Sequence, residues 1–157
     1  MGLDMYLTAE KGFYPYFGDD KEKNRKSFSK LLSGAEITAQ EIDSEFPTAD
    51  VSFKVGYWRK ANAIHAWFVE NVQDGEDNCA SYDVSKEKLI ELKNACVTVL
   101  ADISKAEELL PPEEGFFFGS TEIDEMYLSD LKRTIEIINR CFRERLDTWN
   151  FKYQSSW

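Results

Sequence analysis

The strongest constraint on the fold is a stripe of apolar side chains that recurs every three or four residues in the C-terminal part of the chain. This spacing over residues 122–146 predicts an amphipathic helix, and the apolar face of such a helix must be buried against another element. Thr121 and Asp124 have the spacing of a capping box, so we expect the helix to begin beside them. The stripe consists of Ile123, Tyr127, Leu131, Ile135, Ile138 and Phe142.

Two earlier segments show the same helical period. The spacing predicts helices over residues 59–73 and 86–103, and Ser85 is a suitable N-cap for the second. The stripe of the first helix contains Trp58, Ala61, Ile64, His65, Phe68 and Val72. Three helices of this length can bury their stripes together against a common sheet.

Short stretches of alternating apolar and polar residues predict the strands. Residues 3–8, 51–55 and 151–153 alternate in this way, and Gly56 is expected to end the second strand. Residues 116–118, three phenylalanines, are a further candidate for a short buried strand. The sequence therefore predicts an α+β fold with three main helices packed on a small, mostly antiparallel sheet.

The length of 157 residues predicts one domain over residues 1–157, because a chain of this size can bury a single core. Residues 18–50 lack a clear period and are interpreted as a variable excursion between two strands, with a short helix ending at Gly34 as one option. Residues 74–78 are acidic and read as a solvated loop.

Charge and composition exclude several function classes. The formal net charge is −10, and such a field repels nucleic acid phosphates, so direct nucleic acid binding is not expected. No apolar run is long enough to predict a membrane span, and no N-terminal pattern predicts secretion. Cys79, Cys96 and Cys141 lack the spacing of metal ligands, so we expect free thiols in a reducing cytoplasm, with no metal and no cofactor.

Scarce positive charge gathers where the second strand meets the first helix. Trp58, Arg59, Lys60 and Asn62 bring an aromatic ring, two cations and an amide to a helix N-terminus, which itself favours anions. This pattern indicates an anionic-ligand subsite with a stacking face. The alternative is that Arg59 and Lys60 only pair with the abundant acidic residues.

Other candidates join aromatic rings to polar groups. His65, the one histidine, is a buried core residue, a ligand contact or an acid–base group. Phe117 with Ser120, and Tyr153 with Trp157, offer flat faces and hydrogen-bonding groups typical of a small-ligand pocket. Core packing and helix capping are the alternatives for both pairs.

Four short strings together resemble a family of small proteins encoded by tailed bacteriophages and prophages. They are Met1–Leu7 (MGLDMYL), Val55–His65 (VGYWRKANAIH), Gly115–Thr121 (GFFFGST) and Tyr153–Trp157 (YQSSW). The resemblance covers about residues 1–10 and 51–157. It implies a phage origin, action in the host bacterial cytoplasm and a role in blunting host defences.

We therefore predict a non-enzymatic phage accessory protein that binds a small anionic, nucleotide-like ligand. The alternative is an acidic inhibitor that docks on a basic host protein through the acids of residues 107–130. A nucleotide hydrolase that uses His65 is a third hypothesis, and the binding readings are favoured over it. A homodimer is also possible if the C-terminal strand has an unpaired edge.

Overall fold

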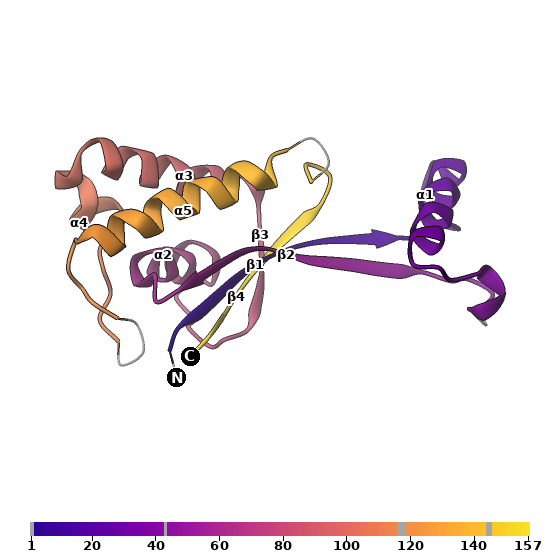
Figure 1. The fold of residues 1–157 in the computed structure, drawn as a ribbon, viewed down its shortest axis with the longest axis horizontal. Coiled ribbons are helices and arrows are strands. Elements are labelled where there is room, and N and C mark those ends of the chain that lie inside the picture. Colours follow the sequence, from indigo (N-terminus) through magenta and orange to yellow (C-terminus); the bar gives the residue numbers. More distant parts are fainter. Residues whose placement is uncertain (1, 43, 116–118, 144–145) are drawn as a thin grey trace. The chain divides into compact units, whose positions relative to one another are not determined.

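The structure is a computed structural model that describes residues 2–42, 44–115, 119–143 and 146–157 (Figure 1). The predicted strand at 116–118 and the candidate ligand residue Phe117 lie outside the described residues. The chain divides into two compact units, one of residues 1–9 with 53–157 and one of residues 10–52. Each unit is described by itself.

The predicted α+β class is confirmed, with an antiparallel sheet of four strands. The strands are β1 (Asp4–Phe13), β2 (Ala49–Arg59), β3 (Ser81–Val84) and β4 (Asn150–Ser156), in the order β2-β1-β4-β3. Figure 1 shows the start of β1 beside the end of β4, so the two chain termini lie close together.

Two strand predictions need correction. Gly56 does not end β2, which continues to Arg59. The predicted unpaired edge of the C-terminal strand is also wrong, because β4 lies between β1 and β3. Tyr82 of β3 pairs with Tyr153 of β4 in antiparallel register. β3 is only four residues long and follows the loop of residues 74–78. It pairs with the edge of β4 that was predicted to be unpaired.

The described residues form five α-helices rather than three main ones. Three of them match the predicted helices and lie in the first unit: α2 (Asn62–Val72), α3 (Lys86–Ala101) and α5 (Glu125–Cys141). The other two are α1 (Lys21–Gly34) and the short α4 (Ala106–Leu109). Single-turn 3-10 segments occur at Ala39–Glu41 and Ile103–Lys105.

Helix ends follow local side-chain capping. Ser85 caps α3 as predicted, with its hydroxyl accepting from the backbone N–H of Lys88. For α5 the cap is Asp124 rather than Thr121, because the Asp124 carboxylate accepts from the backbone N–H groups of Met126 and Tyr127. The helix therefore starts three residues later than the sequence predicted.

One core unites the sheet and the helices of the first unit. β1 alternates between buried and partly exposed positions, so that Met5, Leu7 and Ala9 face inward with no exposed surface. α3 and α5 run side by side over this core (Figure 1). The largest fully buried side chains are Trp58, Tyr153, Phe68, Phe151, Leu3, Met5, Leu7, Ile64, Leu89, Leu92, Leu110 and Leu131.

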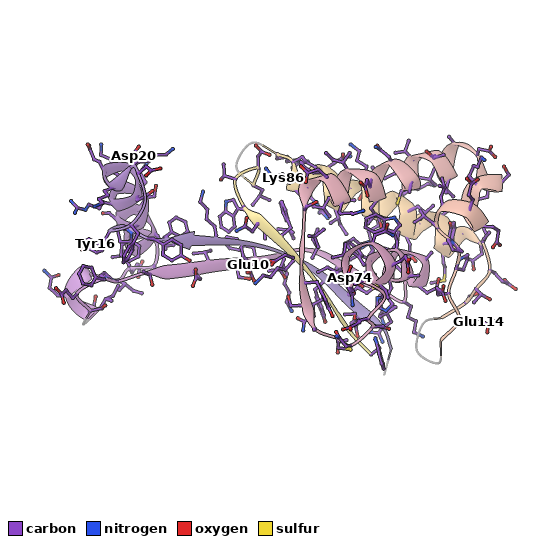
Figure 2. The ribbon with its side chains drawn as sticks, turned by 180° about the vertical axis from the view of Figure 1, so that it is seen from behind. Glu10, Tyr16, Asp20, Asp74, Lys86 and Glu114 are labelled. Atoms are coloured by element: carbon purple, nitrogen blue, oxygen red, sulfur yellow. The ribbon has the colours of Figure 1, made fainter. Side chains whose placement is uncertain are left out.

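The second unit contains the predicted excursion and carries helix α1. Asp20 caps α1 by accepting from the backbone N–H of Lys23, and Phe28 is the buried residue of that helix (Figure 2). Tyr16 and Phe46 meet edge to face, with ring centroids 5.8 Å apart. These contacts give the unit its own small set of packed rings.

Candidate functional site

The junction of β2 and α2 brings together the residues that the sequence selected as an anionic-ligand subsite. The strand ends at Arg59, and the backbone N–H of Lys60 still donates to the carbonyl of Leu3 at 2.8 Å. The chain then turns into α2 through Ala61, whose side chain forms no cap. Alanine has no side-chain acceptor for the first N–H groups of the helix, and the N–H of Asn62 donates to the carbonyl of Lys60 at 2.9 Å.

Lys60 makes this turn in a left-handed backbone conformation, with φ of 58°. Lysine lacks the freedom of glycine there, so the residue is held in place at a cost of about 1–2 kcal/mol. Two glycines flank its side chain: a Cβ built on Gly2 would lie 3.2 Å from Lys60 Cε, and one on Gly119 would lie 3.4 Å from Lys60 Cβ. Backbone strain often gathers at functional sites, and Lys60 shares this conformation with Glu36, Asp74 and Cys79.

A small cleft of about 70 Å³ opens at this junction. Its lining includes Arg59, Lys60 and Asn62 of the predicted subsite, together with Ser120 from a separate candidate pair. Asn62 is buried, and its Nδ2 donates to the carbonyl of Ser120 at 2.7 Å. This bond ties the start of α2 to the segment that precedes α5.

Acidic side chains also line the small cleft, which the sequence analysis did not anticipate. They are Glu122, Asp124 and Asp130. Burial raises the pKa of Asp130 to about 6, an effect that the nearby Arg133 opposes. Across the junction, Arg59 lies 3.7 Å from an oxygen of Asp4. The cleft therefore carries both signs of charge, with the cations on the β2 side.

His65 lies on α2 with 1% of its surface exposed, in a hydrogen-bonded network. Its Nδ1 is 2.7 Å from the hydroxyl of Tyr153, and its Nε2 is 3.0 Å from Oδ2 of Asp77. The other oxygen of Asp77 accepts from the indole N–H of Trp157 at 3.0 Å. Both ring nitrogens of His65 therefore have protein partners.

Asp77 is the residue that sequence reasoning missed, because it lies in the stretch read as a solvated loop. Its carboxylate is hydrogen-bonded to two candidate residues from distant parts of the chain, His65 and Trp157. The imidazole of His65 is bonded in turn to a third candidate, Tyr153. No local spacing signals this role, since the partners are brought together by the pairing of β3 with β4. Figure 2 shows Asp74 at the start of the same loop.

Trp58 and Tyr153 lie in the core and line neither of the two clefts. The indole N–H of Trp58 donates to the hydroxyl of Thr134 at 2.8 Å. The ring of Tyr153 stacks on Phe68 with centroids 3.9 Å apart, and burial raises the pKa of its hydroxyl well above the usual value. Trp157 keeps 43% of its surface exposed.

A second, larger cleft of about 580 Å³ lies along the outer side of α2. Buried Ala63 lines both this cleft and the small one. Its remaining lining is His65, Ala66, Trp67, Val69, Glu70, Asn71, Asp77, Glu108, Leu109, Leu110, Pro111 and Glu113. Figure 2 shows Glu114 on the loop that supplies the last of these residues. Trp67 and Glu70 of this lining were not among the ligand residues predicted from the sequence.

The cysteines offer little nucleophilic chemistry. Burial raises the pKa of the Cys96 thiol to about 12 and that of the Cys141 thiol to about 11, so neither forms a thiolate readily. Cys79 is partly exposed and has a φ of 58°. Within the described ranges, no group of three or more His, Cys, Asp and Glu side chains is arranged to hold a metal ion.

No protein-family model, no curated protein and no solved structure matches this chain. Among the described helices, none combines the length and the apolar character needed to cross a membrane. The two clefts on α2 are therefore the features of the described chain from which a function can be inferred.

Proposed function

We propose that this protein binds a small anionic, nucleotide-like ligand without transforming it, and that the anionic group sits at the N-terminus of α2. The observation that carries the proposal is the cleft at the N-terminus of α2, where Arg59 and Lys60 lie beside a helix start whose N-cap, Ala61, has no capping side chain. Helix N–H groups and an ammonium are the partners that a phosphate prefers.

The size of the small cleft limits what it can hold. Pockets for whole ligands of drug size occupy about 300–1,000 Å³, so a cleft of about 70 Å³ has room for an anionic head only. The body of the ligand would then extend past Ala63 into the larger cleft, where carboxylate oxygens can accept from hydroxyl and amino groups. This division of roles suits a nucleotide-like molecule.

The environment of His65 supports binding rather than catalysis. The chain has one histidine, and both of its ring nitrogens are engaged by Tyr153 and Asp77. A general base needs a ring nitrogen within reach of the substrate proton. The resemblance to tailed-phage proteins supplies the biological setting: capture of a nucleotide-like signal would blunt a host defence.

Calorimetric titration with adenosine monophosphate and with adenosine tests the proposal, since the two differ only in the anionic group. We expect the monophosphate to bind at least about tenfold more tightly, because a hydrogen bond to a charged group contributes about 1.5–3 kcal/mol. Lys60→Gln should remove most of that difference, whereas Lys30→Gln in the other unit should leave it unchanged. Equal affinity for the two probes would reject an anion site at α2.

A second candidate is the acidic inhibitor, which the lining of the larger cleft favours. Glu70, Asp77, Glu108 and Glu113 face that cleft, and the net charge of −10 would attract a basic host protein. Capture of such a partner from host lysate should weaken steeply between low and high salt. Capture that does not respond to salt would remove this candidate.

A further inference from the structure

The larger cleft differs in charge from the small one, which carries both signs. Its lining, as far as the described residues show, contains carboxylates and a histidine but neither lysine nor arginine. Its walls are apolar and aromatic, formed by Trp67, Leu109, Leu110 and Pro111. With a volume of about 580 Å³, the cleft is large enough for a small molecule rather than for a single ion.

The four carboxylates differ in how far they are already engaged. Asp77 accepts from Trp157 and lies against His65, and Glu108 pairs with Lys105 at 2.9 Å on the exposed surface. Glu70 and Glu113 form no ion pair with any described residue. These two side chains are the ones available to a ligand.

The position of Glu70 adds an independent electrostatic argument. It lies in the last turn of α2, where the helix dipole is negative, and no basic residue occupies that turn. A carboxylate there is disfavoured unless a cation lies nearby, and the described chain supplies none in this cleft. A positively charged ligand would offset both the dipole and the carboxylate.

From these observations we infer that the larger cleft binds a protonated amine or guanidinium group carried on an apolar or aromatic body. The cationic head lies between Glu70 and Glu113, and the body packs against Trp67 and the Leu109–Pro111 wall. The ring of Trp67 adds a cation–π surface. Residues of the larger cleft alone carry this inference, so it does not rest on the anion site; an amine bound here would compete with the body of the proposed nucleotide-like ligand for the same cleft.

The test is an NMR titration with protonated phenethylamine and, as its neutral counterpart of similar shape, 2-phenylethanol. We expect the amine to shift the indole N–H of Trp67 and the backbone amides of residues 66–71, with at least about tenfold tighter binding than the alcohol. Equal binding of both probes, or shifts spread evenly over the acidic surface, would overturn the inference. Absence of any shift would overturn it as well.

Two paired variants separate the cleft from general attraction to an acidic protein. Glu70→Gln combined with Glu113→Gln should weaken amine binding about tenfold and leave the alcohol unaffected. Glu91→Gln combined with Glu136→Gln removes the same charge from exposed helix positions away from the cleft and should change neither. Equal losses in both pairs would mean that the net charge alone attracts the amine, and the inference would fail.

Discussion

Lys60 combines a left-handed backbone conformation with a position in the lining of the small cleft. Its φ of 58° is a conformation that glycine adopts freely, so Lys60→Gly relieves strain while it removes the ammonium from the small cleft. We expect the free energy of unfolding to rise by up to about 1 kcal/mol and binding of the monophosphate to be lost. Urea unfolding and calorimetry on the same samples measure both. A variant that binds as well as the wild type would show that Lys60 serves the turn alone.

Asp130 gives the stability a specific dependence on pH. Burial raises its pKa to about 6, whereas in the unfolded chain the pKa is about 3.9. The folded protein therefore binds the Asp130 proton more tightly than the unfolded chain does. The stabilisation that comes from this tighter proton binding is lost as the pH rises from about 4 to about 6. Asp130→Asn should raise the free energy of unfolding at pH 7.5 by about 1 kcal/mol, after allowance for solvent screening.

The check for Asp130 is a pair of urea unfolding series at pH 4.5 and pH 7.5. The wild type should lose more stability between these two values than the Asn variant. The Asn variant should also bind the monophosphate more tightly at neutral pH, because one negative charge is removed from the small cleft. A variant less stable than the wild type at pH 7.5 would contradict this view of Asp130.

The hydroxyl of Tyr153 tests the buried network around His65. Tyr153→Phe removes the partner at 2.7 Å from His65 Nδ1 and leaves a polar nitrogen in the core. We expect a loss of about 1–3 kcal/mol in the free energy of unfolding. Tyr82→Phe is the matched control, because its hydroxyl accepts an exposed bond from Asn78 and should cost less than about 0.5 kcal/mol. Equal costs for the two variants would contradict a structural role for the network.

At the scale of elements, Gly56 sets how closely α5 approaches the sheet. A Cβ built on Gly56 would lie 2.6 Å from Ile137 Cγ2 and 3.1 Å from Leu7 Cβ, and both neighbours are fully buried. Gly56→Ala should therefore cost about 1–3 kcal/mol through overpacking. Gly34→Ala in α1 meets no atom within 4 Å and should change stability by less than about 0.5 kcal/mol. Chemical denaturation of both variants decides whether the close approach at Gly56 is required.

Gly56 also shows why one strand end was predicted wrongly from the sequence. Glycine often ends a strand, but here it continues β2 because the packing of Ile137 requires a residue without a side chain. The helices α2, α3 and α5 were predictable because each carries several turns of apolar repeat. Four-residue β3 was not, since so short a segment has no period and is fixed by its pairing with β4.

In the whole molecule, more of the residues selected from the sequence line the small cleft than line the larger one. Arg59, Lys60 and Asn62 are neighbours in the chain, so their place in one cleft could be predicted from a short stretch of sequence. Glu70, Asp77 and Glu113 come from separate elements and meet only in the folded chain. The fold thus places the proposed anion site at the N-terminus of α2 and a carboxylate-lined cleft along the same helix.

Native mass spectrometry of wild-type and Lys60→Gly proteins purified from bacteria detects a bound ligand itself. We expect a phosphate-bearing small-molecule adduct on the wild type, lost on denaturation and absent or strongly reduced in the Lys60→Gly variant. A bare mass for both proteins, before and after incubation with adenosine monophosphate, would contradict anionic-ligand binding. An equal adduct on both would contradict the placement of its anionic group beside Lys60.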